Sequence, residues 1–108
     1  MDEIIWKDVC DFEGLYLVSN TGLIKSLISN IILKQGPTSK FYAQVGLYKN
    51  GIKTTKNVHR IVTESFFGKS TLDVNHKDCN KRNNNISNLE QKINYLNRNN
   101  LDNNRKDK

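Results

Sequence analysis

The chain has 108 residues, of which 36% are hydrophobic, and a formal net charge of +6 at pH 7. This length allows one small domain, or two very small modules packed together, around a thin hydrophobic core. No apolar run is as long as a membrane span, and the acidic start Met1-Asp2-Glu3 is unlike a signal peptide, so we expect a cytoplasmic protein.

The charge is unevenly distributed along the chain. Residues 1–30 carry two basic and five acidic groups, residues 31–69 carry seven and one, and residues 70–108 carry eight and five. A basic middle and C-terminal part beside an acidic start favours a surface that faces a polyanion. Lysine-rich surfaces also keep proteins soluble, so charge alone leaves nucleic-acid binding open.

The first half of the chain predicts short strands joined by tight turns. Trp6 is expected to anchor a first small core. Residues 16–27 are typical of a strand, a turn and a second strand, because Asn20-Thr21-Gly22 supplies turn chemistry between two apolar runs. Residues 31–33 are a further short strand, which ends before Gly36-Pro37.

A hairpin and a helix are expected in the middle of the chain. Asn50-Gly51 is the strongest turn signal in the sequence and joins strands at residues 42–48 and 53–59, whose register the sequence leaves open. Apolar side chains at positions 61, 62, 66 and 67 predict a helix over residues 60–67, which ends at Gly68. The remaining expectations are an extended segment at 72–76, a loop at 77–88, a strand at 89–93, a helix at 94–101 that Asn94 caps, and a polar tail at 102–108.

The segment from Val74 to Glu90 is the most informative stretch. His76 follows an apolar residue, and imidazole side chains in general exchange protons near neutral pH. Oxygen-bearing side chains suited to a hard cation follow, with lysines and arginines around them. These are the parts needed to hydrolyse a phosphodiester. Asp78 is expected to brace the loop through backbone N–H groups, and so are the nearby asparagines Asn80, Asn83, Asn84 and Asn85.

Two parts of the chain resemble known families. Trp6, Glu13 to Gly22 and Ile24-Lys25-Ser26 resemble the small N-terminal motif called NUMOD4. A second set of segments resembles the HNH endonucleases of phages and mobile introns. These segments are Val58-His59-Arg60-Ile61-Val62 with Phe66, Val74-Asn75-His76-Lys77-Asp78, Asn80-Lys81, Asn83-Asn84 and Asn88-Leu89-Glu90. The two resemblances extend to about residue 100, and Cys79 stands where relatives commonly have glycine.

The resemblance implies an α+β fold, in which small antiparallel β-hairpins precede a ββα-metal (HNH) unit. It divides the chain into a NUMOD4-like β module at 1–50, an HNH nuclease module at 51–101 and the tail at 102–108. The implied activity is nicking or double-strand cutting of DNA by a metal-dependent endonuclease. If the chain is encoded by a phage or virus, it would act in the cytoplasm of the host cell.

The resemblance also assigns roles to site residues. It implies that His76 is the general base, and that Asn88 braces the loop and helps to hold His76. Asn97, on the last helix, stands where the family binds its metal. Asn75 occupies the position before the base, where many relatives carry an aspartate ligand. The implied cofactor is one divalent cation, Mg²⁺ or Mn²⁺.

Contacts with DNA are expected from basic side chains of the middle and the C-terminal part. Such contacts to phosphates give salt-sensitive affinity without sequence information. Relatives often carry further C-terminal DNA-binding motifs, so a partner protein or a dimer is expected to select the site. The expected contacts are Lys49, Lys53, Lys56, Arg60, Lys77, Lys81, Arg82 and Arg98.

Two alternatives stay open at this point. Asn75 and Asn97 are both neutral, so the chain is alternatively a non-catalytic DNA-binding module with a degenerate HNH site. His76 and Cys79 have a spacing that zinc sites use, and His59 and Cys10 could complete a structural zinc site, although a structural hydrogen bond is the favoured role of His59. The two cysteines are too few for a disulfide framework.

Overall fold

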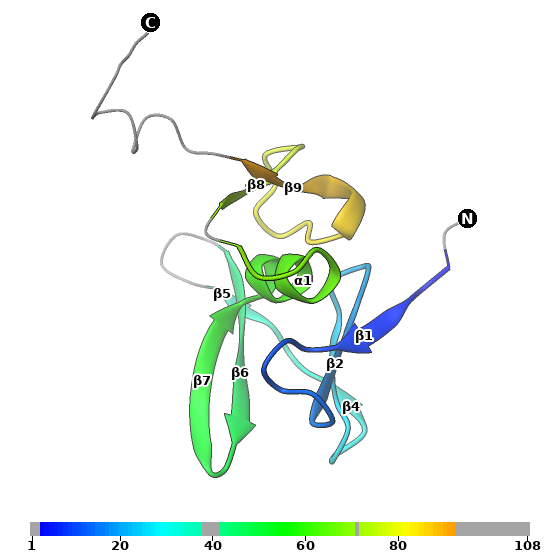
Figure 1. Cartoon of the computed structure of the whole chain (residues 1–108), viewed down its shortest axis with the longest axis vertical. Helices are drawn as coiled ribbons and strands as arrows, with labels where there is room; N and C mark the ends of the chain where they lie inside the picture. The colour runs from blue at the N-terminus through cyan, green and yellow to red at the C-terminus, as the bar shows by residue number, and fades with distance from the viewer. Residues whose placement is uncertain (1–2, 38–41, 71, 93–108) are drawn as a thin grey trace, which may run out of the picture.

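The structure is a computed structural model that describes residues 3–37, 42–70 and 72–92 (Figure 1). Within these residues the fold is α+β, with antiparallel sheets and one α-helix, which confirms the expected fold class. The elements in chain order are β1 (Trp6–Asp8), β2 (Tyr16–Ser19), β3 (Ile24–Ser26), β4 (Ile31–Ile32), β5 (Gly36–Pro37), β6 (Ala43–Lys49), β7 (Ile52–Asn57), α1 (Val58–Phe66), β8 (Asp73–His76), the 3-10 helix η1 (Ile86–Asn88) and β9 (Leu89–Lys92).

The first sheet has the strand order β1-β2-β3-β4. The expected turn between β2 and β3 is present, and Gly22 has a φ of +95°, a left-handed conformation that favours glycine. The side chain of Ser19 closes this turn, because its Oγ accepts a hydrogen bond of 3.0 Å from the backbone N–H of Leu23. Trp6 is only half-buried and lies outside the buried core, so the expectation that it anchors this region is wrong. The buried side chains here include Val9 and Val18.

The second sheet is built on the hairpin of β6 and β7, with β5 on the other side of β6. Asn50 and Gly51 both have positive φ, 53° and 76°, as a two-residue hairpin turn with the twist of the strands requires. Burial alternates along β6, so that Val45 and Leu47 face the core. The structure therefore settles the register that the sequence left open, with Val45 opposite Lys56.

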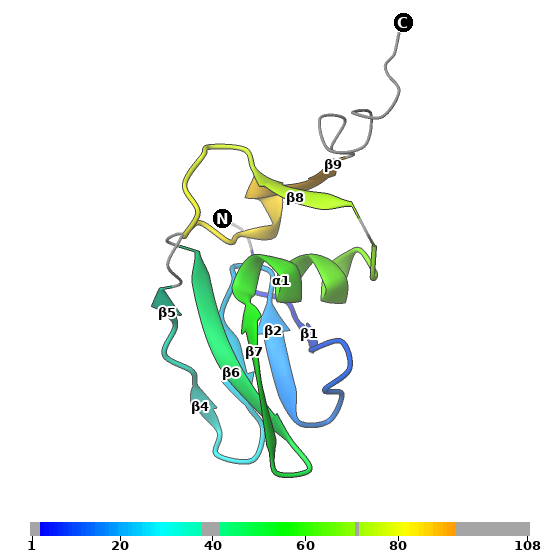
Figure 2. The ribbon, with the colours of Figure 1, turned by 90° about the vertical axis from the view of Figure 1, so that its left-hand side faces the viewer.

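Helix α1 lies at the centre of the molecule. It begins at Val58, two residues earlier than the sequence predicts, because β7 runs directly into it through the extended residue Asn57. It lies between the β8–β9 ribbon and the other two sheets (Figures 1 and 2). One core cluster joins both halves of the chain and includes Val18, Leu47, Ile61 and Leu89.

The third sheet is the antiparallel ribbon of β8 and β9, in which His76 pairs with Leu89 and Asn75 with Glu90. The expected loop lies between the strands and ends in η1. The helix that the sequence predicts at 94–101 lies outside the described residues. No helix in the described part of the chain is long and apolar enough to cross a membrane.

Candidate active site

The site is built around His76, the last residue of β8. His76 is only 6% exposed. Its Nε2 lies 2.8 Å from Oδ1 of Asn84, a residue that is 4% exposed. In this orientation of the Asn84 amide, Oδ1 accepts the hydrogen bond and Nε2 of His76 donates it, while the buried Nδ2 of Asn84 has no hydrogen-bond partner among the described residues. The lone pair of the imidazole is therefore on Nδ1. A neutral imidazole that is held in one tautomer in this way is suited to take a proton from water.

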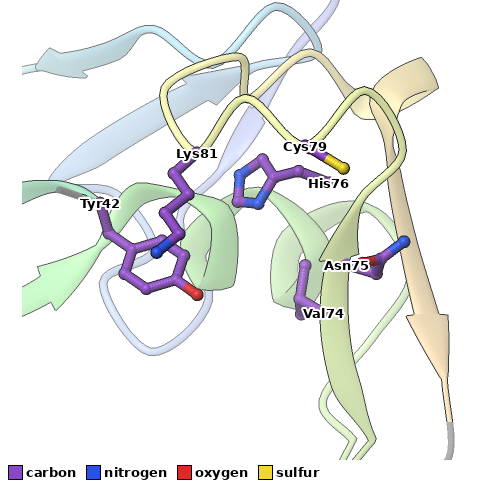
Figure 3. A pocket seen from close by; sticks show the side chains of 6 residues that line it. All are labelled: Tyr42, Val74, Asn75, His76, Cys79 and Lys81. Carbon is purple, nitrogen blue, oxygen red and sulfur yellow. The ribbon is translucent and has the colours of Figure 1, made fainter. Parts of the chain in front are cut away.

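The imidazole lines a cavity of about 220 Å³ whose walls come from three parts of the chain (Figure 3). Lys81 lies beside the imidazole, and its Nζ is 4.8 Å from the centre of the Tyr42 ring. A lysine cation at this place is suited to a phosphate oxygen. The lining residues are Tyr42, Val74, Asn75, His76, Cys79 and Lys81.

A cluster of rings supports the imidazole from behind. The His59 ring centre is 5.3 Å from that of His76 and 4.8 Å from that of Tyr42. Burial, and secondarily the charges of His76 and Arg60, lower the pKa of His59 to about 4, so this side chain is neutral near neutral pH. Its buried Nδ1 finds no hydrogen-bond partner among the described residues, so the structural hydrogen bond expected there is not observed at this atom.

The asparagine-rich loop is held by Asp78, as expected. Its carboxylate accepts hydrogen bonds from the backbone N–H of Asn80 and from the Nδ2 atoms of Asn83 and Asn88, at 2.8, 2.8 and 2.9 Å. The bond from Asn83, then those from Asn80 and Asn88, lower the pKa of Asp78. Cys79 has a φ of 65°, a left-handed conformation that glycine adopts without strain.

Asn88 and Asn84 divide the task that the sequence assigned to Asn88 alone. Asn88 ties the loop, since its Oδ1 accepts from the backbone N–H of Asp78 at 3.1 Å, while its backbone oxygen accepts from Lys77 N–H at 2.8 Å. The bond to the imidazole comes from Asn84, which sequence reasoning placed among the loop-bracing residues. Asn84 follows His76 by eight residues, and this spacing predicts a contact only when the path of the loop between them is known.

The N-terminal sheet packs directly against this loop. The backbone oxygen of Asn20 accepts a hydrogen bond of 2.7 Å from the backbone N–H of Ile86. Gly22 lies so close to Asn84 that a Cβ at position 22 would be 3.0 Å from the Cβ of Asn84. The β2–β3 turn therefore packs against Asn84 and helps to fix its position.

The expected metal ligands are only partly within the described residues. Asn75 is exposed on β8, and its Nδ2 donates a hydrogen bond of 2.8 Å to Oε2 of Glu90. Asn97 lies outside the described residues. In the described part of the chain, no group of three or more His, Cys, Asp or Glu side chains is placed to hold a metal ion. The structure thus does not form the zinc site considered for His59, His76 and the two cysteines.

The basic residues expected to contact DNA fall into two groups. Three of them make contacts within the fold: Lys49 Nζ donates to Asp11 O at 2.7 Å, Lys56 pairs with Glu64 at 3.1 Å, and Arg60 donates to Leu72 O at 3.0 Å. The other described residues of this set are exposed on β7 or on the loop after His76, and Lys81 among them also lies over the Tyr42 ring. They are Lys53, Lys77, Lys81 and Arg82. Arg98 lies outside the described residues.

Comparisons with known proteins agree with this arrangement. Residues 56–93 match the HNH endonuclease family, and residues 5–48 match the NUMOD4 motif. The DNA endonuclease I-HmuI of Bacillus phage SP01 is 43% identical over 97 residues, which are 85% of this chain and 56% of that protein. An uncharacterised HNH endonuclease of Acanthamoeba polyphaga mimivirus is 45% identical over 87 residues, which are 79% of this chain and 26% of that protein.

A solved structure has the same fold. The structure that describes DNA binding and cleavage by the HNH homing endonuclease I-HmuI superposes with a TM-score of 0.79 at 41% identity, and covers 86% of this chain and 55% of that one. Residues 56–93 therefore belong to the HNH endonuclease family, and the NUMOD4 motif at residues 5–48 precedes them. It spans about half the length of I-HmuI, the phage relative that it matches.

Proposed function

We propose that this chain is a DNA endonuclease that hydrolyses phosphodiester bonds with His76 as general base. The observation that carries the proposal is the 2.8 Å bond between Nε2 of His76 and Asn84, which leaves Nδ1 for chemistry in a cavity that Lys81 also lines. The match of residues 56–93 to the HNH endonuclease family and the similarity to the DNA endonuclease I-HmuI support it.

His76 acts on water in this proposal. Nδ1 takes a proton from the water whose oxygen forms the new bond to phosphorus, while the bond from phosphorus to the 3′ oxygen breaks. The departing oxygen takes a proton from solvent, and the products are a 5′-phosphate and a 3′-hydroxyl. Asn84 holds the imidazole that becomes charged, and Lys81 neutralises part of the phosphate charge.

A divalent cation, Mg²⁺ or Mn²⁺, belongs to the proposal as well. The exposed amide of Asn75 beside the Glu90 carboxylate offers oxygen atoms of the kind that hard cations prefer, so the residues present fit such an ion. Asn97 is a further proposed ligand. When bound, the cation would stabilise the negative charge on the phosphate and on the leaving oxygen.

The proposed partner is double-stranded DNA, held by phosphate contacts. Lys77 and Arg82 lie in the same loop as Lys81, Lys53 lies on β7, and all three are exposed. Because phosphate contacts carry no sequence information, we propose that a second protein, a second copy or further residues of a longer protein select the site. The cytoplasm, where such DNA is accessible, is the proposed location.

One observation favours a second function, a DNA-binding module without catalysis. Asn75 is neutral at the position where the resemblance to HNH endonucleases implies an aspartate ligand, and a neutral residue there weakens a metal site. The two functions are separated by incubating supercoiled plasmid with the protein in the presence of Mg²⁺, Mn²⁺ or chelator. The endonuclease proposal predicts metal-dependent nicking that His76→Ala abolishes, with salt-sensitive DNA binding retained. Salt-sensitive DNA binding without nicking in either cation would leave the binding module as the function, and equal nicking by the wild type and His76→Ala would refute His76 as the base.

A further inference from the structure

A carboxylate lies beside the neutral residue that precedes the base. Asn75 on β8 and Glu90 on β9 are direct cross-strand partners, and Nδ2 of Asn75 donates to Oε2 of Glu90 at 2.8 Å. Directly opposite residues in an antiparallel pair project from the same face of the ribbon. The carboxylate that position 75 lacks is therefore present at the same place, on the neighbouring strand.

The two faces of the β8–β9 ribbon differ in character. His76 and Leu89 are buried, whereas Asn75 is exposed and Glu90 is half-buried. Side chains alternate along a strand, so Asn75 and Glu90 lie on the opposite face from His76. Figure 3 shows the Asn75 side chain directed toward β9, away from the imidazole. Asn75 also lines the cavity that contains His76, whereas Glu90 is not among the lining residues.

The chemistry of the pair suits a hard cation. The amide of Asn75 donates through Nδ2, so its Oδ1 keeps its lone pairs for a metal ion. A carboxylate has about four lone-pair positions and can accept this hydrogen bond while it also binds a cation. The hydrogen bond fixes the direction of both side chains, as partners of metal ligands commonly do.

We propose that Glu90 is the anionic ligand of the divalent cation, which it binds together with Oδ1 of Asn75. The assignment rests on the proposed endonuclease function and adds a residue to its metal site. It explains how a chain with asparagine at position 75 can have a charged oxygen ligand, because Glu90 on the neighbouring strand projects from the same face of the ribbon.

The test is a titration of the full chain with MnCl₂ alone, in which free Mn²⁺ is measured by electron paramagnetic resonance. Glu90→Gln removes the charge and keeps the size of the side chain. Asp73→Asn is the matched control, since it removes one carboxylate from the same ribbon, at a residue that is exposed and pairs with Lys92. The double variant Asn75→Asp with Glu90→Gln exchanges carboxylate and amide between the strands.

The proposal predicts that Glu90→Gln weakens Mn²⁺ binding about tenfold or more, as loss of a charged ligand does, while Asp73→Asn changes it less than about twofold. The double variant should regain most of the lost affinity. Unchanged affinity in Glu90→Gln, equal losses in Glu90→Gln and Asp73→Asn, or no binding by the wild type would each overturn the assignment. Plasmid nicking by the same preparations separates failure of this assignment from failure of the endonuclease function. Nicking that persists in Glu90→Gln would refute Glu90 as the ligand and leave the endonuclease function intact.

Discussion

At the scale of single residues, the bond between His76 and Asn84 is the contact on which the proposed chemistry depends. Replacing Asn84 with alanine removes the acceptor at Nε2, so that the imidazole loses its fixed tautomer and direction. We expect kcat for plasmid nicking to fall by about 10- to 100-fold, part of what a general base contributes, with little change in KM. Steady-state kinetics with a plasmid substrate measure both constants.

The matched control for this variant is Asn80→Ala. Asn80 lies in the same loop, and its Oδ1 accepts from the backbone N–H of Arg82 without touching the imidazole. It should therefore keep nearly wild-type kcat if the direct bond matters. A similar fall in kcat for both variants would show that loop order, rather than the bond to His76, controls the rate.

His59 makes the stability of the fold depend on pH. Burial lowers its pKa to about 4, whereas the unfolded chain takes up this proton near the ordinary value of 6.5. Its contribution is therefore present above pH 6.5 and is lost as the pH falls toward 4, by about 3 kcal/mol for one proton. Urea unfolding at several pH values measures this loss. His59→Phe, which cannot titrate, should show a weaker pH dependence in this window, and equal slopes in the two proteins would refute the assignment.

At the scale of elements, the β2–β3 turn and the loop after β8 form one contact that the Gly22→Ala variant can test. A Cβ there would meet Asn84 at 3.0 Å, and the φ of +95° already disfavours alanine. We expect a loss of about 1–3 kcal/mol in the free energy of unfolding, together with slower nicking, because Asn84 must shift. Chemical denaturation and the nicking assay measure the two effects.

Gly14→Ala provides the comparison for this contact. Gly14 has a φ of +79°, but a Cβ there meets nothing within 4 Å. It should lose stability through its backbone conformation alone and keep the nicking rate per folded molecule. If Gly14→Ala and Gly22→Ala slow nicking equally, the turn has no specific role in holding Asn84.

The elements that the sequence predicted well have local causes. Asn50-Gly51 and the turn at Gly22 depend on backbone conformations that few residues adopt, so their signals lie within a few residues. The packing around Asn84 has no such local signal, because it depends on the turn at Gly22, more than sixty residues away in the sequence, which contacts the loop. Asn84 is also one of twelve asparagines between positions 75 and 104, so the sequence alone does not distinguish it from the others.

The place of Glu90 also could not be predicted from the sequence. Its place opposite Asn75 follows from the register of β8 and β9, which the sequence leaves undetermined by one or two residues. A shift of one residue would have moved Glu90 to the face of His76. The resemblance to HNH endonucleases identified His76, Asn75 and the loop, while the pairing of strands was needed to find the carboxylate.

At the scale of the whole molecule, the two family matches meet in one core. The cluster that contains Val9 and Ile24 from the NUMOD4 match also contains Ile61 and Leu89 from the HNH match. The NUMOD4 part thus contributes a packed face and the β2–β3 turn to the same structure that orients His76. Both matched parts of the chain therefore support His76, although the core is thin.

The central claim is that His76 is the base, and imidazole rescue of His76→Gly tests it most directly. The measurement is the initial rate of metal-dependent plasmid nicking by this variant, without and with added imidazole. We predict a loss of about 100-fold or more without imidazole, and a partial recovery that rises with its concentration, because the Asn84 acceptor remains to orient the added ring. A His76→Gly variant that nicks plasmid at the wild-type rate without imidazole would contradict the account.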